Sequence, residues 1–210
     1  MLSVLSQRFS EGGLFMWIIL SVFAVAMAVV LDRLIFFFLY NPSRGQNLVA
    51  PIMEALKKDD AQLAEKIASK GDAPINVLVR VAINRYRAGH NIEQIRDSIE
   101  EASIKQIPRL SHRLNYLAVF ANIATLLGLL GTIAGLQVSF SSLAATEAAK
   151  KAAMLAQGIS QAMNTTAFGL IVAVPCMIMY TMLTNMRDRL IKDLDESLVR
   201  IINFMKQKRA

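Results

Sequence analysis

The stretch LAVFANIATLLGLLGTIAGLQVSFSSL, residues 117–143, decides the fold of this 210-residue chain. It contains no Asp, Glu, Lys, Arg or His, and it is longer than the about 20 residues that an α-helix needs to cross a bilayer. A second uncharged stretch covers residues 158–184, and a third covers residues 14–31. The sequence therefore predicts an all-α membrane protein with three transmembrane helices.

The charge and cysteine content argue against several other classes of protein. The chain is 54% hydrophobic with a net charge of +7, but its Lys and Arg flank the apolar runs, which argues against a nucleic-acid-binding protein. Cys176 is the only cysteine, and His90 and His112 are far apart in sequence, so we expect no disulfide, metal site or cofactor. With no recognisable nucleophile–base pair or phosphate-binding loop, we also expect no enzymatic activity.

Lysine and arginine are distributed unequally about the apolar runs. Residues 41–113 hold twelve of them and the tail after residue 184 holds seven, whereas the opposite side has only Arg8, Lys150 and Lys151. Because cytoplasmic loops carry the excess of Lys and Arg, we expect the N-terminus to be periplasmic. The predicted organisation is a periplasmic segment (1–13), a retained first span (14–40), a cytoplasmic helical segment (41–113), a second span (114–143), a short periplasmic link (144–157), a third span (158–184) and a cytoplasmic C-terminal helix (185–210).

The charged segment between the first two spans shows several helical patterns. Apolar residues recur at helical spacing over 48–68, a second helix is expected over 75–86, and a third starts at Asn91, where Asn91–Gln94 resembles a capping box. Pro108 either kinks that helix or lies in the first turn of the next one. The amphipathic, basic tail either packs against neighbouring subunits beneath the membrane or binds anionic lipid.

Two of the spans each carry a narrow stripe of small and hydroxyl-bearing residues. The stripe of the second span is Asn122, Thr125, Gly128, Thr132, Gly135, Ser139 and Ser142, and that of the third is Gly158, Gln161, Thr165, Gly169, Ala173, Cys176, Tyr180 and Thr184, with Thr166 beside Thr165. Steps of three or four residues place each set on one helix face. The first span has almost no such residues, so we expect it to face lipid. Such stripes most often let helices pack closely, and the same surface can line a polar path.

Neither stripe contains an Asp, Glu, Lys, Arg or His. A proton relay across a membrane needs an ionisable group. The only acid near a membrane core is Asp32, which we expect to pair with Arg33 at the membrane interface. If ions move along this face, another chain must therefore supply the carboxylate.

The strings LLGLLGTIAG (126–135) and GISQAMNTTAFGLIVAVP (158–175) resemble the ExbB/TolQ/MotA proton-channel family and are closest to its ExbB and TolQ branch. The three-span layout and the Asp32-Arg33-Leu34 triplet are similar to the same branch. This resemblance implies a homopentamer in the bacterial inner membrane around a single-span partner of the ExbD/TolR type, which supplies the missing Asp. It further implies that ion flow through the complex drives work on the cell envelope.

Matching positions imply roles for individual residues. Thr132 and Thr166 correspond to the family's pore-facing threonines. The whole ion-path set expected here is Thr125, Thr132, Ser139, Gln161, Thr165 and Thr166, and the packing and kink set is Gly128, Gly131, Gly135, Gly169 and Pro175. Two positions depart from the family pattern, because Thr125 stands where a proline is usual and Gln161 where a glutamate is common. The Thr165–Thr166 doublet resembles sodium-driven members, so the alternatives are a proton-driven motor, a sodium-driven motor and a non-conducting scaffold.

Overall fold

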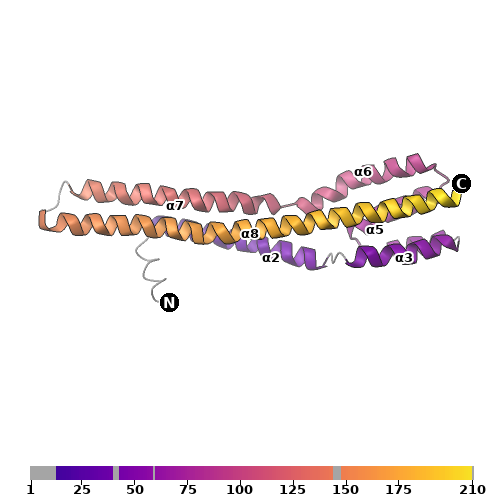
Figure 1. Ribbon diagram of the computed structural model, residues 1–210, viewed down its shortest axis with the longest axis horizontal. Helices are drawn as coiled ribbons and strands as arrows, with labels where there is room; N and C mark the ends of the chain where they lie inside the picture. Colours follow the sequence, from indigo (N-terminus) through magenta and orange to yellow (C-terminus); the bar gives the residue numbers. More distant parts are fainter. Residues whose placement is uncertain (1–12, 40–42, 59, 144–147, 210) are drawn as a thin grey trace. The chain divides into compact units, whose positions relative to one another are not determined.

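The computed structural model of the chain describes residues 13–39, 43–58, 60–143 and 148–209. Within these ranges every regular element is a helix, which confirms the predicted all-α fold. The helices are α2 (Leu14–Leu39), α3 (Ser43–Lys57), α4 (Ala61–Ala68), α5 (Pro74–Arg87), α6 (Ile92–Ser111), α7 (Leu114–Leu143) and α8 (Ala148–Arg209) (Figure 1). Residues 1–12 of the expected N-terminal segment and residues 144–147 of the expected link lie outside the described residues.

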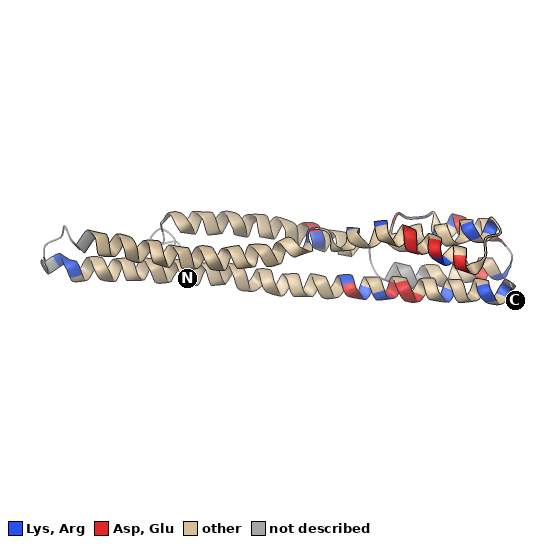
Figure 2. Cartoon of the chain, turned by 90° about the horizontal axis from the view of Figure 1, so that it is seen from above, with Lys and Arg blue, Asp and Glu red and all other residues tan. Residues whose placement is uncertain are grey.

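The chain divides into two compact units. The first, here called the membrane unit, comprises residues 1–33 and 113–182, and the second, the charged unit, comprises residues 34–112 and 183–210. Among the described residues, three helical stretches are long and apolar enough to cross a membrane. They lie within Leu14–Phe38, Ile92–Ser141 and Lys150–Lys208. Helix α7 contains no acidic or basic residue, whereas α6 contains both, as the colours of the cartoon in Figure 2 show.

Local signals set the helix boundaries in the charged unit. The side chain of Asn91 accepts a hydrogen bond from the backbone of Gln94, and the Gln94 side chain accepts one from the backbone of Asn91, so the predicted capping box is confirmed. Pro108 lies inside α6 and not in the first turn of the next helix, so the second of the two alternatives is wrong. The helical pattern over 48–68 is split into α3 and α4, because the Asp60 side chain accepts from the backbone amide of Leu63 and starts a new helix there.

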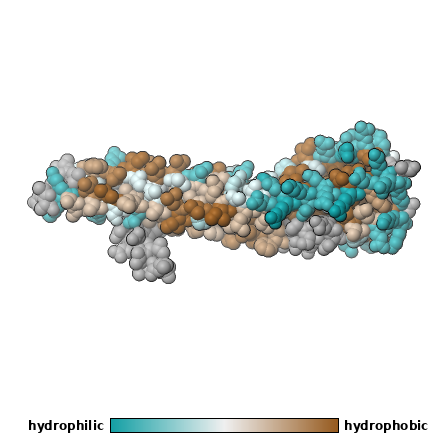
Figure 3. Space-filling view, in the orientation of Figure 1, coloured by the Kyte–Doolittle hydropathy of each residue, from teal (hydrophilic) through white to brown (hydrophobic). Residues whose placement is uncertain are grey.

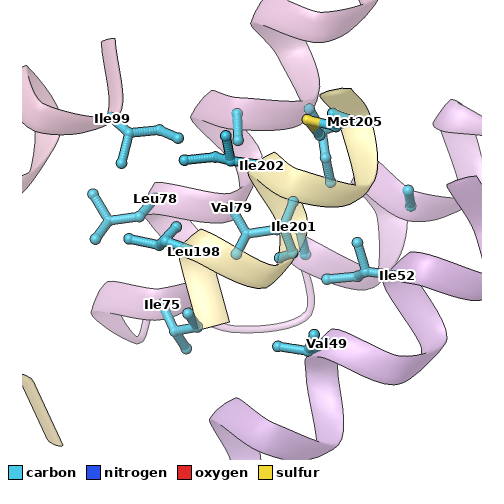
Figure 4. Packing of buried hydrophobic residues seen from close by; sticks show 14 of the residues in the cluster. Val49, Ile52, Ile75, Leu78, Val79, Ile99, Leu198, Ile201, Ile202 and Met205 are labelled. Carbon is cyan, nitrogen blue, oxygen red and sulfur yellow. The ribbon is translucent and has the colours of Figure 1, made fainter. Parts of the chain in front are cut away.

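The charged unit has a hydrophobic core to which the C-terminal part of α8 contributes. Figure 4 shows how side chains from this part of α8 lie among those of the other helices. Buried members include Val49, Ile52, Leu78, Val79, Ile99, Leu198, Ile201, Ile202 and Met205. The amphipathic face predicted for the tail is therefore occupied by protein from the same chain.

In the membrane unit, α2 also contributes to the packing. Met16, Ile19 and Ala26 are fully buried, while Leu14 and Trp17 are exposed. Most of α2 is nevertheless unburied, with 22% of its apolar window buried against 28% in each of the other two spans, so its facing lipid stays a prediction. Arg113, which directly precedes the start of α7 at Leu114, has φ 65°.

Candidate functional site

Helices α7 and α8 meet along a row of small residues. An ideal Cβ atom on Gly128 would lie 3.3 Å from the Cα of Thr166 and 3.4 Å from the Cα of Gly169. A Cβ atom on Gly169 would lie 2.7 Å from the carbonyl oxygen of Ala124. Backbone therefore packs directly on backbone at this level, and a side chain on Gly169 would force the helices apart.

The same contact continues toward the end of α7. A Cβ atom on Gly135 would lie 3.4 Å from the Cα of Ala162, which is an ordinary packing distance. A Cβ atom on Gly158 would overlap the hydroxyl of Ser139, so the serine side chain fills the space that the glycine leaves. Small residues on one helix thus accommodate specific side chains of the other.

The hydroxyl groups of the predicted ion path all donate to backbone carbonyl oxygens. The Oγ1 of Thr166 donates across the helix contact to the carbonyl oxygen of Gly128 at 3.0 Å. The other four donate within their own helices: Thr125 to Ala121 at 3.0 Å, Thr132 to Leu129 at 2.6 Å, Ser139 to Gly135 at 2.8 Å, and Thr165 to Gln161 at 2.9 Å. The hydroxyl of Thr166 therefore joins α7 to α8.

The structure separates the six predicted path residues by burial. Thr165 is 1% exposed and Ser139 is 4% exposed, so both lie inside the helix contact. Thr132, Gln161 and Thr166 are half-buried, and Thr125 is exposed. Of the remaining stripe residues, Asn122 is exposed and the side chain of Ser142 lies outside the described part of the chain.

The predicted packing residues behave differently from Pro175. Gly128, Gly131, Gly135 and Gly169 are all buried. Pro175 is exposed on α8, which remains helical through it. Next to the packing row, the side-chain amide of Gln161 lies over Gly13, where a Cβ atom would stand 2.7 Å from its nitrogen.

Sequence reasoning missed two features of this region. The contact row on α7 includes buried Ala121 and Ala124, and the steps of three and four through Gly128, Gly131 and Gly135 could have revealed it. The second feature is a partner for the Asp32–Arg33 pair.

The ion pair at the end of the membrane unit contains three residues. Arg33 donates from Nε and Nη2 to Oδ2 of Asp32 at 3.0 and 2.8 Å, so the pair predicted from the sequence is confirmed. Arg113 also approaches the same oxygen, with its Nη1 at 3.4 Å. This third member links α2 to the start of α7, which no local sequence pattern indicated.

Three apolar helices and a helix contact built on small residues define a multi-pass, all-α membrane protein. Much of the surface seen in Figure 3 over α7 and the first half of α8 is apolar, as expected for contact with lipid or with other helices. Within the described residues, no three His, Cys, Asp or Glu side chains are grouped as metal ligands.

The chain belongs to the MotA/TolQ/ExbB proton channel family, whose sequence profile matches residues 70–196. The relatives place it in the ExbB/TolQ branch. It is 30% identical over 202 residues to the biopolymer transport protein exbB1 of Vibrio cholerae, covering 92% of this chain and 85% of the relative. It is 34% identical over 80 residues to the Tol-Pal system protein TolQ of Haemophilus influenzae, covering 38% of this chain and 35% of the relative.

A further relative is longer than this chain. The putative biopolymer transport protein ExbB homolog of Methanothermobacter thermautotrophicus is 25% identical over 183 residues, which is 87% of this chain but 63% of the relative. The family is one of transport-associated proton channels and not of enzymes. The chain is therefore a proton-channel, motor-type membrane subunit.

Proposed function

We propose that this chain is the pore-lining subunit of an ion-driven inner-membrane motor that couples ion flow to work on the cell envelope. The observation that carries the proposal is the α7–α8 contact, where Thr132 and Thr166 stand half-buried beside backbone-on-backbone packing. Residues 114–143 and 158–184 contain no Asp, Glu, Lys, Arg or His. An ion path along these helices therefore needs a carboxylate from a second chain.

The second chain in this proposal is a single-span subunit of the ExbD/TolR type, enclosed by five copies of this chain. The distribution of Lys and Arg favours a periplasmic N-terminus and a cytoplasmic charged unit. The bounds expected from the sequence are retained as part of the proposal: spans over 14–40, 114–143 and 158–184, joined by a cytoplasmic segment and a periplasmic link. In each copy the ion path runs along Thr125, Thr132, Gln161 and Thr166, with Thr165 and Ser139 behind them.

Flux through the reconstituted complex tests the proposal. The chain and its single-span partner are purified together and placed in liposomes that contain a proton-sensitive dye, and flux is followed under an imposed potential. We expect flux to be lost when the partner's intramembrane Asp is changed to Asn, and to fall at least several-fold in Thr166→Val. The control is Thr181→Val, because the exposed Thr181 likewise donates to a backbone carbonyl oxygen, that of Met177 in its own helix at 3.0 Å, and not across the α7–α8 contact. Wild-type flux in Thr166→Val would contradict the proposed path.

Gln161 favours a second candidate, a non-conducting scaffold of the same fold. Its side-chain amide replaces the carboxylate common in the ExbB/TolQ branch and covers Gly13, which is a packing role. A correctly assembled complex without flux would favour this candidate. The sodium-driven alternative rests on the Thr165–Thr166 doublet, and the same liposomes in sodium and sodium-free buffer distinguish it from proton-driven transport.

A further inference from the structure

The threonine hydroxyls of the proposed path already donate hydrogen bonds within the chain. Thr125, Thr132 and Thr166 each have a single hydroxyl proton, and in each case it points to a backbone carbonyl oxygen at 3.0 Å or less. A hydroxyl group has one donor and two acceptor lone pairs. What these side chains offer to a group outside the chain is therefore an oxygen lone pair and not a proton.

We infer that the threonine hydroxyls of the ion path act only as hydrogen-bond acceptors, so that they bind the partner's carboxyl group in its protonated form and not as a carboxylate. This inference rests on the proposed function and specifies what the path recognises. A protonated carboxyl group can donate to such an oxygen, whereas a carboxylate can only accept. Hydronium and hydrated cations are also donors, and they fit the same lining.

The carbonyl oxygen of Gly128 holds the Thr166 hydroxyl in the direction in which it donates to the backbone and not to an outside group. This oxygen accepts the hydroxyl of Thr166, and in the regular helix it also accepts the amide of Thr132. A carboxylate could accept a hydrogen bond from the hydroxyl of Thr166 only if the hydrogen bond from Thr166 to Gly128, which joins the two helices, were broken. That exchange is unfavourable because it removes the hydrogen bond that Thr166 makes between α8 and α7.

No charged group of the described membrane unit lies near this level, and the side-chain donors close to Thr166 on α8 are the neutral amides of Gln161 and Asn164. Lys151 precedes Thr166 by fifteen residues on α8, and Arg113 precedes Gly128 by fifteen residues, which corresponds to about 22 Å along each helix. On α2, Asp32 forms ion pairs with its neighbour Arg33 and with that same Arg113. The other titratable side chains of this unit, Tyr116, Cys176 and Tyr180, are at least ten residues from Gly128 or Thr166 on the same helix, or about 15 Å.

The test follows the protonation of the partner's intramembrane Asp in the purified complex. Its protonated carboxyl group is detected by its infrared carbonyl band, identified as the band lost when that Asp is changed to Asn, and the pH midpoint of the band is measured. Since a hydrogen bond to the neutral form raises a carboxyl pKa, removing the acceptor lowers the midpoint. We expect Thr166→Val to lower it by about 0.5–1 pH unit and Thr166→Ser to leave it unchanged.

Thr132→Val provides the second variant, because its hydroxyl bonds within α7 and its loss does not loosen the helix contact. We expect a midpoint shift in the same direction, and none in Thr181→Val. An unchanged or raised midpoint in both valine variants would overturn the inference, since a raised midpoint means that the hydroxyls donate to the carboxylate. Lowered midpoints in a complex that carries no flux would uphold the inference and refute the proposed function.

Discussion

The carbonyl oxygen of Ala124 occupies the space in which a side chain on Gly169 would begin, 2.7 Å from the ideal Cβ position. Backbone atoms of α7 cannot yield as a flexible side chain would. We therefore expect Gly169→Ala to lower the free energy of unfolding by about 1–3 kcal/mol, measured by denaturant titration of the purified chain in detergent.

Gly135→Ala is the matched control for this prediction. A Cβ atom at residue 135 would meet Ala162 at 3.4 Å, so the methyl group fits with little displacement. Its unfolding midpoint should stay close to that of the wild type. If both alanine variants unfold alike, the close contact at Gly169 does not determine how α7 and α8 pack.

Arg113 combines an unfavourable backbone conformation with an ion pair. Its φ of 65° is in the left-handed region, which glycine adopts without cost. Arg113→Gly and Arg113→Ala both remove the contact with Asp32, but only glycine relieves the backbone. We expect the glycine variant to be more stable than the alanine variant by about 1 kcal/mol, by thermal unfolding in detergent. If the two variants were equally stable, the left-handed backbone conformation of residue 113 would not cost the alanine variant any stability.

Lys208 connects the end of α8 to the end of α3 within the charged unit. Its Nζ donates to the carbonyl oxygen of Leu56 at 2.6 Å, and this carbonyl is among the last four of α3, which have no partner inside their own helix. Lys208→Met should destabilise the end of α3 by about 1 kcal/mol and speed hydrogen exchange there. Lys206→Met, at an exposed position two residues earlier, is the control and should leave exchange unchanged.

The Glu54–Lys58 pair on α3 predicts a pH dependence. The hydrogen bond from Lys58 is the largest cause that lowers the pKa of Glu54 below its ordinary value of 4.5, and the same bond raises the pKa of Lys58. A lowered carboxyl pKa means that the pair stabilises the fold above pH 4.5 and that this contribution is lost as the pH falls through the folded value.

Carbon NMR of the Glu54 carboxyl group measures this directly. We expect its titration midpoint below 4.5 in the wild type and close to 4.5 in Lys58→Met. Both side chains are exposed, so high salt should reduce the difference. A midpoint that does not respond to Lys58→Met would contradict the assignment of its cause.

Local signals in the sequence predicted most of the helices, and the main error arose where such a signal was overlooked. The capping box at Asn91 was recognisable because both of its partners lie within four residues. The break before α4 was missed because apolar residues keep their helical spacing across it, although Asp60 carries the capping side chain. Arg113 beside Asp32 depends on how α2 packs against α7, and single-chain periodicity contains no information about that contact.

The candidate site was predictable only to within one position around each helix. Successive residues differ by about 100° in direction, so a stripe defined by steps of three and four does not fix which edge is buried. The structure buries Gly128 and Gly131, while Asn122 and Thr125 on the neighbouring edge are exposed. The acceptor of the Thr166 hydroxyl could not be predicted from the sequence either, because it is thirty-eight residues away.

Pro175 makes the bending stiffness of α8 differ along its length. A proline has no amide hydrogen, so the helix lacks the bond that residue 175 would make to the carbonyl of residue 171. Bending stiffness is therefore lowest over this turn, which begins two residues after Gly169. Under a sideways force, α8 would bend mainly at the proline. The glycine contact between α8 and α7 would keep its register.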